Sequence, residues 1–171
     1  IPLTDYDKPE NWLALAHEFG HHVFWNALKN AVEVAELQLA MQNAISGALR
    51  GANLDIWISW MEELFADIMG TLLEGPKYAL SCQYFAMERA NNLDALVVND
   101  GEHPPLYIRP LIANQVLREI ASHNNKSDFN NLADEIGRNW AKFSEGVEQL
   151  TLSNSQIPVS AISANIQPGV Y

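Results

Sequence analysis

The chain has a single cysteine, Cys82, among 171 residues, which excludes an intrachain disulfide. An unpaired cysteine suits a reducing compartment, so we expect a cytoplasmic protein. The sequence shows neither a signal-peptide pattern nor an apolar run of the roughly 20 residues that a membrane-spanning helix needs. We therefore expect no membrane span in this chain.

Positive charge is also scarce, because 10 Lys and Arg stand against 21 Asp and Glu, for a formal net charge of −11 at pH 7. Sequence-independent binding of nucleic acid requires clustered Lys and Arg, so we expect no nucleic-acid partner. Hydrophobic residues make up 48% of the chain and charged residues 18%, which is typical of a globular protein. The length suffices for one domain with its own core, and the composition leaves the oligomeric state open.

Apolar periodicity of the helical kind dominates the chain and predicts a mainly α fold with little or no sheet. The first predicted helix runs from the turn at residues 5–9 to about residue 28. Further helices are predicted over 30–49, 54–73 and 77–91, in a segment that follows His103, and over 127–146. Pro110 must kink the helix after His103 or mark its true start. Residues 1–150 are predicted to form one domain and residues 151–171 an irregular tail, which is loop, edge strand or poorly ordered. The chain begins at Ile1, close to the first predicted helix, which leaves open whether strands precede it.

The motif HEFGHH, which begins at His17, places polar side chains in an otherwise apolar helix. His17 and His21 lie one turn apart on one helical face, where their imidazoles can bind one Zn²⁺. Glu18 points to the adjacent side, where it can accept a proton from metal-bound water. Gly20 leaves room for a close neighbour, although glycine weakens a helix. His22 faces about 100° away from His21 and is not expected to bind the same ion. The alternative is a buried helix whose histidines only satisfy hydrogen bonds.

A third ligand is predicted in the segment SWMEELFADIMG. Glu63 and Asp67 are four residues apart, so a helix presents both carboxylates on one face, where they repel unless a cation lies nearby. We assign Glu63 as the third ligand and Asp67 as the acceptor for the far nitrogen of a ligand histidine, for which we expect His17. Glu62 is the rival ligand, but it lacks a carboxylate four residues on and is expected to point to solvent.

The segment DGEHPPLYIRP contains His103, two prolines and, six positions after the histidine, Arg109. The prolines restrict the backbone after His103 and suit a side chain that must be aimed. An imidazole near the metal would stabilise negative charge that develops in a transition state. Arg109 is expected to pair with a site carboxylate or with substrate. The alternative for this segment is an ordinary helix-capping turn.

Together, the three motifs resemble the gluzincin metallopeptidases. H-E-x-G-H at 17–21, E-x-x-A-D at 63–67 and H-P-P with a following Arg at 103–109 occur in the order seen in that clan. The likeness is greatest to the branch with the heat-shock membrane protease and the prenyl-protein endopeptidases. It covers about 90 residues, and this chain departs from that branch because it lacks transmembrane helices and the strands that usually precede the active-site helix.

The resemblance implies a zincin-like helical domain with an active-site helix and a third-ligand helix. It implies that two histidines and the later glutamate bind Zn²⁺, and that the first-motif glutamate is the general base. Carried onto this sequence, these roles fall on His17, His21, Glu63 and Glu18, with Asp67 orienting a histidine. The H-P segment and its Arg help to shape the site in the clan, and the resemblance assigns these roles to His103 and Arg109.

The predicted function is therefore a zinc-dependent endopeptidase that acts on a peptide or protein substrate. One alternative is a zinc-binding, non-proteolytic regulatory or scaffold domain that keeps the same site. A di-iron bundle is a weaker alternative, because Glu18 and His21 form one E-x-x-H element but the sequence has no second one.

Overall fold

The computed structural model describes residues 13–26, 31–48, 54–98, 100–152 and 155–158. Within these ranges the chain is mainly helical, which confirms the predicted fold class. The elements are α1 (Leu13–Asn26), α2 (Ala31–Ala48), α3 (Leu54–Ser59), α4 (Met61–Glu74), α5 (Pro76–Arg89), α6 (Leu93–Leu96), α7 (Ile108–Asn124), α8 (Ser127–Phe143), β1 (Gln149–Leu152) and β2 (Ser155–Pro158). No helix in the described part of the chain combines the length and apolar character that crossing a membrane requires.

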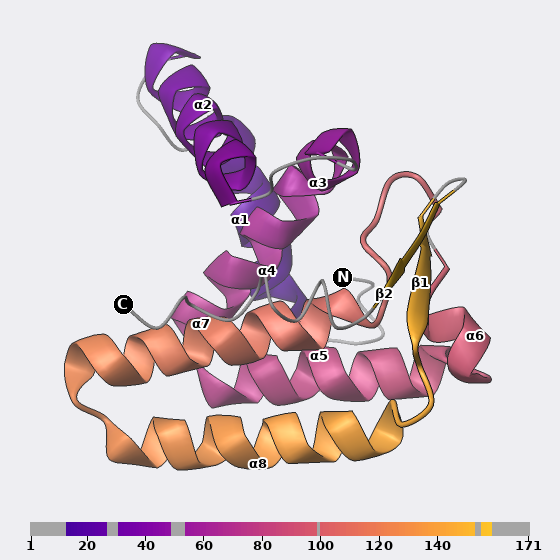
Figure 1. The fold of residues 1–171 in the computed structure, drawn as a ribbon. Coiled ribbons are helices and arrows are strands. Elements are labelled where there is room, and N and C mark those ends of the chain that lie inside the picture. Colours follow the sequence, from indigo (N-terminus) through magenta and orange to yellow (C-terminus); the bar gives the residue numbers. More distant parts are fainter. Residues whose placement is uncertain (1–12, 27–30, 49–53, 99, 153–154, 159–171) are drawn as a thin grey trace, which may run out of the picture.

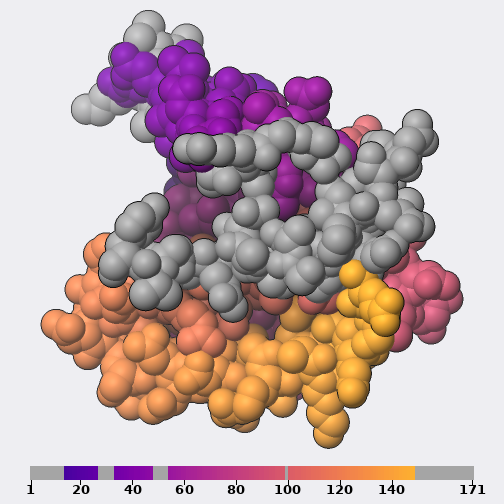
Figure 2. Space-filling view, viewed as in Figure 1, coloured from indigo at the N-terminus to yellow at the C-terminus, as the bar shows by residue number. Residues whose placement is uncertain are grey.

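Two groups of helices meet at α4. Helices α5, α7 and α8 run side by side, while α1 packs along α4 and crosses behind this layer (Figure 1). Helix α4 also contacts α5 and α7, so it joins the two groups. Helix α2 contacts α1 and α3 and projects away from the layer, as the space-filling view shows at the top of Figure 2. The two motifs with predicted metal ligands therefore lie on the packed pair α1 and α4.

Glycine and proline set the helix boundaries around α4, α5 and α7. Gly75 ends α4 with a φ of 60°, a conformation that favours glycine, and Pro76 occupies the first turn of α5, where its missing amide costs no hydrogen bond. Pro110 lies in the first turn of α7, so it belongs to the start of that helix rather than to a kink. The helix predicted over 54–73 divides at Trp60, whose fully buried indole packs against Trp57.

The chain after α8 forms two short strands. Strands β1 and β2 form an antiparallel hairpin in which Leu150 pairs with Ile157 and Leu152 with Ser155. The hairpin crosses the predicted boundary at residue 150, and β2 lies wholly within the predicted tail. An edge strand was one of the alternatives that the sequence left open for the tail, because alternation in so short a segment is too weak to separate a strand from a loop. Residues 159–171 and the predicted helix start at 5–9 lie outside the described residues.

Two clusters of buried side chains form the core. One lies at the junction of α3 to α8 and consists of Trp57, Trp60, Leu64, Ala86, Leu96, Tyr107, Ile108 and Trp140. The other joins α1 to the three-helix layer and consists of Ala16, Tyr78, Ala79, Cys82, Ala113, Leu117, Ala133 and Ile136. The second cluster fixes the start of α1 against α5 and α7, directly beside the histidine motif.

We expect Leu117→Ala to lower the free energy of unfolding by about 2–5 kcal/mol, because Leu117 is fully buried in the second cluster and its truncation leaves a cavity. The measurement is urea unfolding followed by circular dichroism. Leu72→Ala is the matched control, since Leu72 is exposed on α4 and its truncation should change stability by about 0.5 kcal/mol or less. Equal losses in the two variants would contradict this packing.

Candidate metal centre

The site depends on a close approach of α1 to α4. Gly20 faces Ala66, and a Cβ atom built on Gly20 would lie 2.6 Å from the Ala66 Cα. Ala66 is fully buried in α4, so this backbone cannot move away without disturbing the packing around it. The small residues at this crossing bring the histidines of α1 against the acidic residues of α4.

Three electron-pair donors from these two helices surround one point. The two histidine Nε2 atoms of His17 and His21 are 3.0 Å apart. The Glu63 carboxylate lies 3.4 Å from Nε2 of His17 and 3.3 Å from Nε2 of His21. Ligands placed tetrahedrally at about 2.0–2.1 Å from a zinc ion are separated by roughly 3.3 Å. The distance from His17 is to Oε2 of Glu63 and the distance from His21 is to Oε1, so the two carboxylate oxygens each lie at about this separation from one imidazole. The three residues form a metal-compatible group among the described residues.

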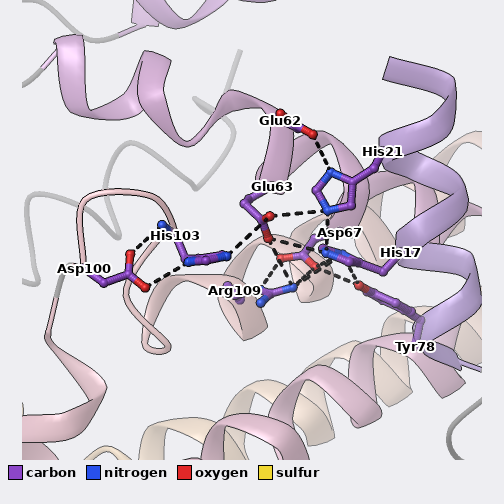
Figure 3. A network of polar contacts seen from close by, with 9 residues as sticks. All are labelled: His17, His21, Glu62, Glu63, Asp67, Tyr78, Asp100, His103 and Arg109. Carbon is purple, nitrogen blue, oxygen red and sulfur yellow. Dashed lines mark hydrogen bonds and ion pairs between the residues drawn. The ribbon is translucent and has the colours of Figure 1, made fainter. Parts of the chain in front are cut away.

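The far nitrogen of each histidine faces a carboxylate (Figure 3). Nδ1 of His17 lies 3.0 Å from Oδ1 of Asp67, and Nδ1 of His21 lies 2.8 Å from Oε1 of Glu62. Because an ionised carboxylate only accepts hydrogen bonds, each Nδ1 carries the proton and donates it. In the neutral imidazoles both Nε2 atoms then direct lone pairs toward each other and toward Glu63. A proton shared among these atoms, or a metal ion in its place, relieves the repulsion between the lone pairs, so the donor set fits a cation.

Asp67 is completely buried and lies at the centre of a polar network. Arg109 donates from Nε to Oδ2 and from Nη2 to Oδ1, both at 2.7 Å. The Tyr78 hydroxyl also donates to Oδ1 at 2.7 Å. Burial alone would raise the pKa of Asp67, but the charge and hydrogen bonds of Arg109 outweigh it and lower the pKa to about 2. Asp67 is therefore a fixed acceptor for His17.

The charge of the cluster also suits a divalent cation. The carboxylates of Glu62, Glu63 and Asp67 surround two imidazoles, and the guanidinium of Arg109 compensates one of the three charges. In the metal-free protein, burial acts to lower the pKa of His17, but hydrogen bonds to Asp67 and Glu63 outweigh it and raise the pKa to about 9. The surroundings that favour a proton on this imidazole equally favour a metal ion at Nε2.

His103 lies on the loop before α7 and points toward the group formed by His17, His21 and Glu63. Its Nε2 lies 3.8 Å from Oε1 of Glu63, and its side chain is half exposed. Asp100 holds the ring by accepting from Nδ1 at 2.9 Å, and it also accepts from the backbone amides of His103 and Glu102. These backbone bonds lower the pKa of Asp100. The loop is thus a turn organised by Asp100 that aims an imidazole at the metal ligands.

The structure brings together most of the residues singled out by the sequence. His17, His21, Glu63 and Asp67 lie in one cluster, with His103 beside it. Arg109 was expected to pair with a site carboxylate or with substrate, and the structure shows it paired with the carboxylate of Asp67. Its side chain is largely covered, so Arg109 positions Asp67.

Two further residues of α1 lie on its outer side. Glu18 is exposed immediately after His17, and His22 is exposed and lies outside the metal-compatible group. Within the described residues, Glu18 forms no hydrogen bond or ion pair with His17, His21 or Glu63.

Sequence reasoning placed Glu62 in solvent, and the structure corrects this. Spacing along α4 indicates only partners on the same helix, whereas the partner of Glu62 is His21 on α1. The sequence did not predict Tyr78 or Asp100 as residues of the site. The Gly-Pro turn before Tyr78 and the Asp-Gly pair before His103 were the available signals, since both dipeptides mark turns that aim the residues after them.

No protein-family model, curated protein or solved structure gives a significant match to this chain. The resemblance to gluzincins therefore stays a prediction that depends on the three motifs.

We expect Gly20→Ala to weaken metal binding strongly, because the added methyl group would collide with the Ala66 backbone and force α1 away from α4. The measurement is zinc affinity in competition with a chromogenic chelator. Gly47→Ala is the control, since a Cβ at Gly47 on α2 meets nothing within 4 Å and alanine favours a helix. Unchanged zinc affinity in Gly20→Ala would contradict the proposed role of this crossing.

The neighbouring glutamates of α4 provide a second test. Glu63→Gln should abolish stoichiometric zinc binding, because it removes the carboxylate ligand. Glu62→Gln should leave one zinc per chain but lower its affinity by about 10–100-fold, because Glu62 only orients His21. Elemental analysis and chelator competition report these outcomes. The reverse ranking would make Glu62 the ligand.

Proposed function

We propose that this chain is a zinc-dependent endopeptidase of the gluzincin type. The observation that carries the proposal is the convergence of His17 Nε2, His21 Nε2 and the Glu63 carboxylate, whose two oxygens lie 3.4 Å and 3.3 Å from the two imidazoles. Two imidazoles favour zinc or a similar transition metal over calcium or magnesium, which prefer oxygen ligands. Three protein ligands leave a fourth position for water, as in catalytic zinc sites, whereas structural sites are closed by a fourth protein ligand.

The ligand side chains are 14–21% exposed, which supports access of water and substrate to the fourth position. The unpaired, buried Cys82 supports the cytoplasmic location that we include in the proposal. The substrate is a peptide or protein, because the general base and the second imidazole suit hydrolysis of an amide bond.

The hydrolytic step requires a base, a group that stabilises negative charge and an acid for the leaving amine. A bound zinc ion supplies polarisation of a water molecule and lowers its pKa toward 7. Glu18 accepts a proton as the water oxygen bonds to the carbonyl carbon, and it donates this proton to the amine nitrogen as the carbon–nitrogen bond breaks. The position of Glu18, directly after His17 and exposed on α1, supports this role.

His103 is proposed to stabilise the carbonyl oxygen as it becomes negative. Asp100 accepts from Nδ1 and thereby turns the Nε2 side of the ring toward Glu63. Donation from Nε2 requires the imidazolium form, in which Nδ1 also keeps its hydrogen bond to Asp100. Such a donor, held in place before the reaction, stabilises developing charge without reorganising. Arg109 and Asp67 act behind His17, where they fix the orientation of this ligand.

We expect Glu18→Gln to retain one zinc per chain and to lose hydrolysis of a mixed peptide library, because glutamine cannot accept the proton. Chelation should abolish the wild-type activity and added zinc should restore it. Glu135→Gln is the matched control, since Glu135 is exposed on α8, away from α1.

Full hydrolytic activity in the Glu18→Gln protein would refute this mechanism. One zinc per wild-type chain without any cleavage would refute the peptidase and favour a zinc-binding regulatory or scaffold domain.

A further inference from the structure

Tyr78 lies on the Nδ1 side of His17, away from Nε2, and no sequence motif assigns it a role. It is the third residue of α5 and its side chain is buried. Its hydroxyl oxygen lies 2.7 Å from Oδ1 of Asp67 and 3.1 Å from Nδ1 of His17 (Figure 3). Through these two contacts the hydroxyl of Tyr78 on α5 is linked to Asp67 on α4 and to His17 on α1.

The direction of these hydrogen bonds follows from the chemistry of the three groups. Asp67 only accepts, so the Tyr78 hydroxyl must donate its proton to Oδ1. The hydroxyl oxygen then has a lone pair available for the Nδ1 proton of His17, which lies between the carboxylate and the hydroxyl. Two acceptors on one side of the ring restrict its rotation more than Asp67 alone would, and they direct Nε2 toward His21 and Glu63.

The packing around Tyr78 shows that this position is built into the fold. A Cβ atom on Gly70 would lie 2.5 Å from the Tyr78 Cζ, so the ring occupies space that only glycine leaves free. Gly70 follows Asp67 by three residues and therefore lies on the same side of α4. The turn at Gly75 and Pro76 starts α5 so that Tyr78 reaches this gap.

We propose that Tyr78 is a positioning residue that orients the His17 imidazole for metal binding through its hydroxyl group. This inference rests on the metal centre of the proposed function but not on peptide hydrolysis. Tyr78 contacts the Nδ1 side of His17, opposite the metal-binding Nε2, and it is buried, so it does not touch substrate. Tyr78 is thus distinct from a catalytic tyrosine.

The test compares Tyr78→Phe with Tyr84→Phe, which removes an exposed hydroxyl from the same helix. We expect Tyr78→Phe to lower zinc affinity by about 10–100-fold, as is typical when a group that orients a ligand is lost. The visible absorption bands of the Co²⁺-substituted protein should also change, since they report ligand orientation. Tyr84→Phe should match the wild type in both measurements.

Thermal unfolding of the metal-free proteins separates positioning from simple stabilisation. A lower unfolding temperature in Tyr78→Phe with wild-type zinc affinity and wild-type Co²⁺ bands would overturn the inference. If Tyr78→Phe does not fold, Gly70→Ala is the second variant, because its methyl group shifts the ring while keeping the hydroxyl. An unchanged zinc affinity in Gly70→Ala would then overturn it.

The outcomes for the wild-type protein distinguish the two proposals. Zinc binding without cleavage refutes the peptidase and leaves the role of Tyr78 standing. No zinc binding by the wild type refutes both. Cleavage together with equal zinc affinity in wild type and Tyr78→Phe refutes the inference alone.

Discussion

The buried ion pair of Asp67 and Arg109 holds together the parts of this molecule from which the site is built. Asp67 has no contact with solvent, and a buried carboxylate is stable only when its charge is compensated and its lone pairs are used. Arg109 supplies two hydrogen bonds, Tyr78 a third and His17 a fourth. These donors come from the starts of α7 and α5 and from α1, so one carboxylate on α4 fixes the mutual position of four helices.

This arrangement connects stability to the chemistry of the site. Removal of either partner of a buried ion pair leaves an uncompensated charge, so neither residue can change alone without a large cost. The same pair keeps Asp67 ionised, and an ionised Asp67 keeps the proton of His17 on Nδ1. The orientation of the His17 ring, with Nε2 directed toward His21 and Glu63, therefore depends on the buried ion pair. The second ligand, His21, depends instead on Glu62, a carboxylate that is partly exposed and has more freedom to move.

Local features of the sequence predicted much of the fold. Helical periodicity indicated the helices, and the Gly75-Pro76 pair marked the end of α4 because both residues act through their own backbone. The division at Trp60 was missed and a strand after α8 was only one of three alternatives, since both features depend on packing and pairing rather than on local preference. For the site, the four-residue spacings of His17 with His21 and of Glu63 with Asp67 put the right side chains on common faces, because helix geometry is the same everywhere.

The sequence by itself determined which groups share a helical face, and hence the candidate ligands and the order of the motifs. Only the tertiary structure decided which faces meet. The contact of Glu62 with His21, the choice of Asp67 as partner for Arg109 and the place of Tyr78 behind His17 all join residues 41 or more positions apart, or on different helices. Spacing along one helix contains no information on such contacts, because they depend on how closely α1 approaches α4, and that distance is set by Gly20 against Ala66.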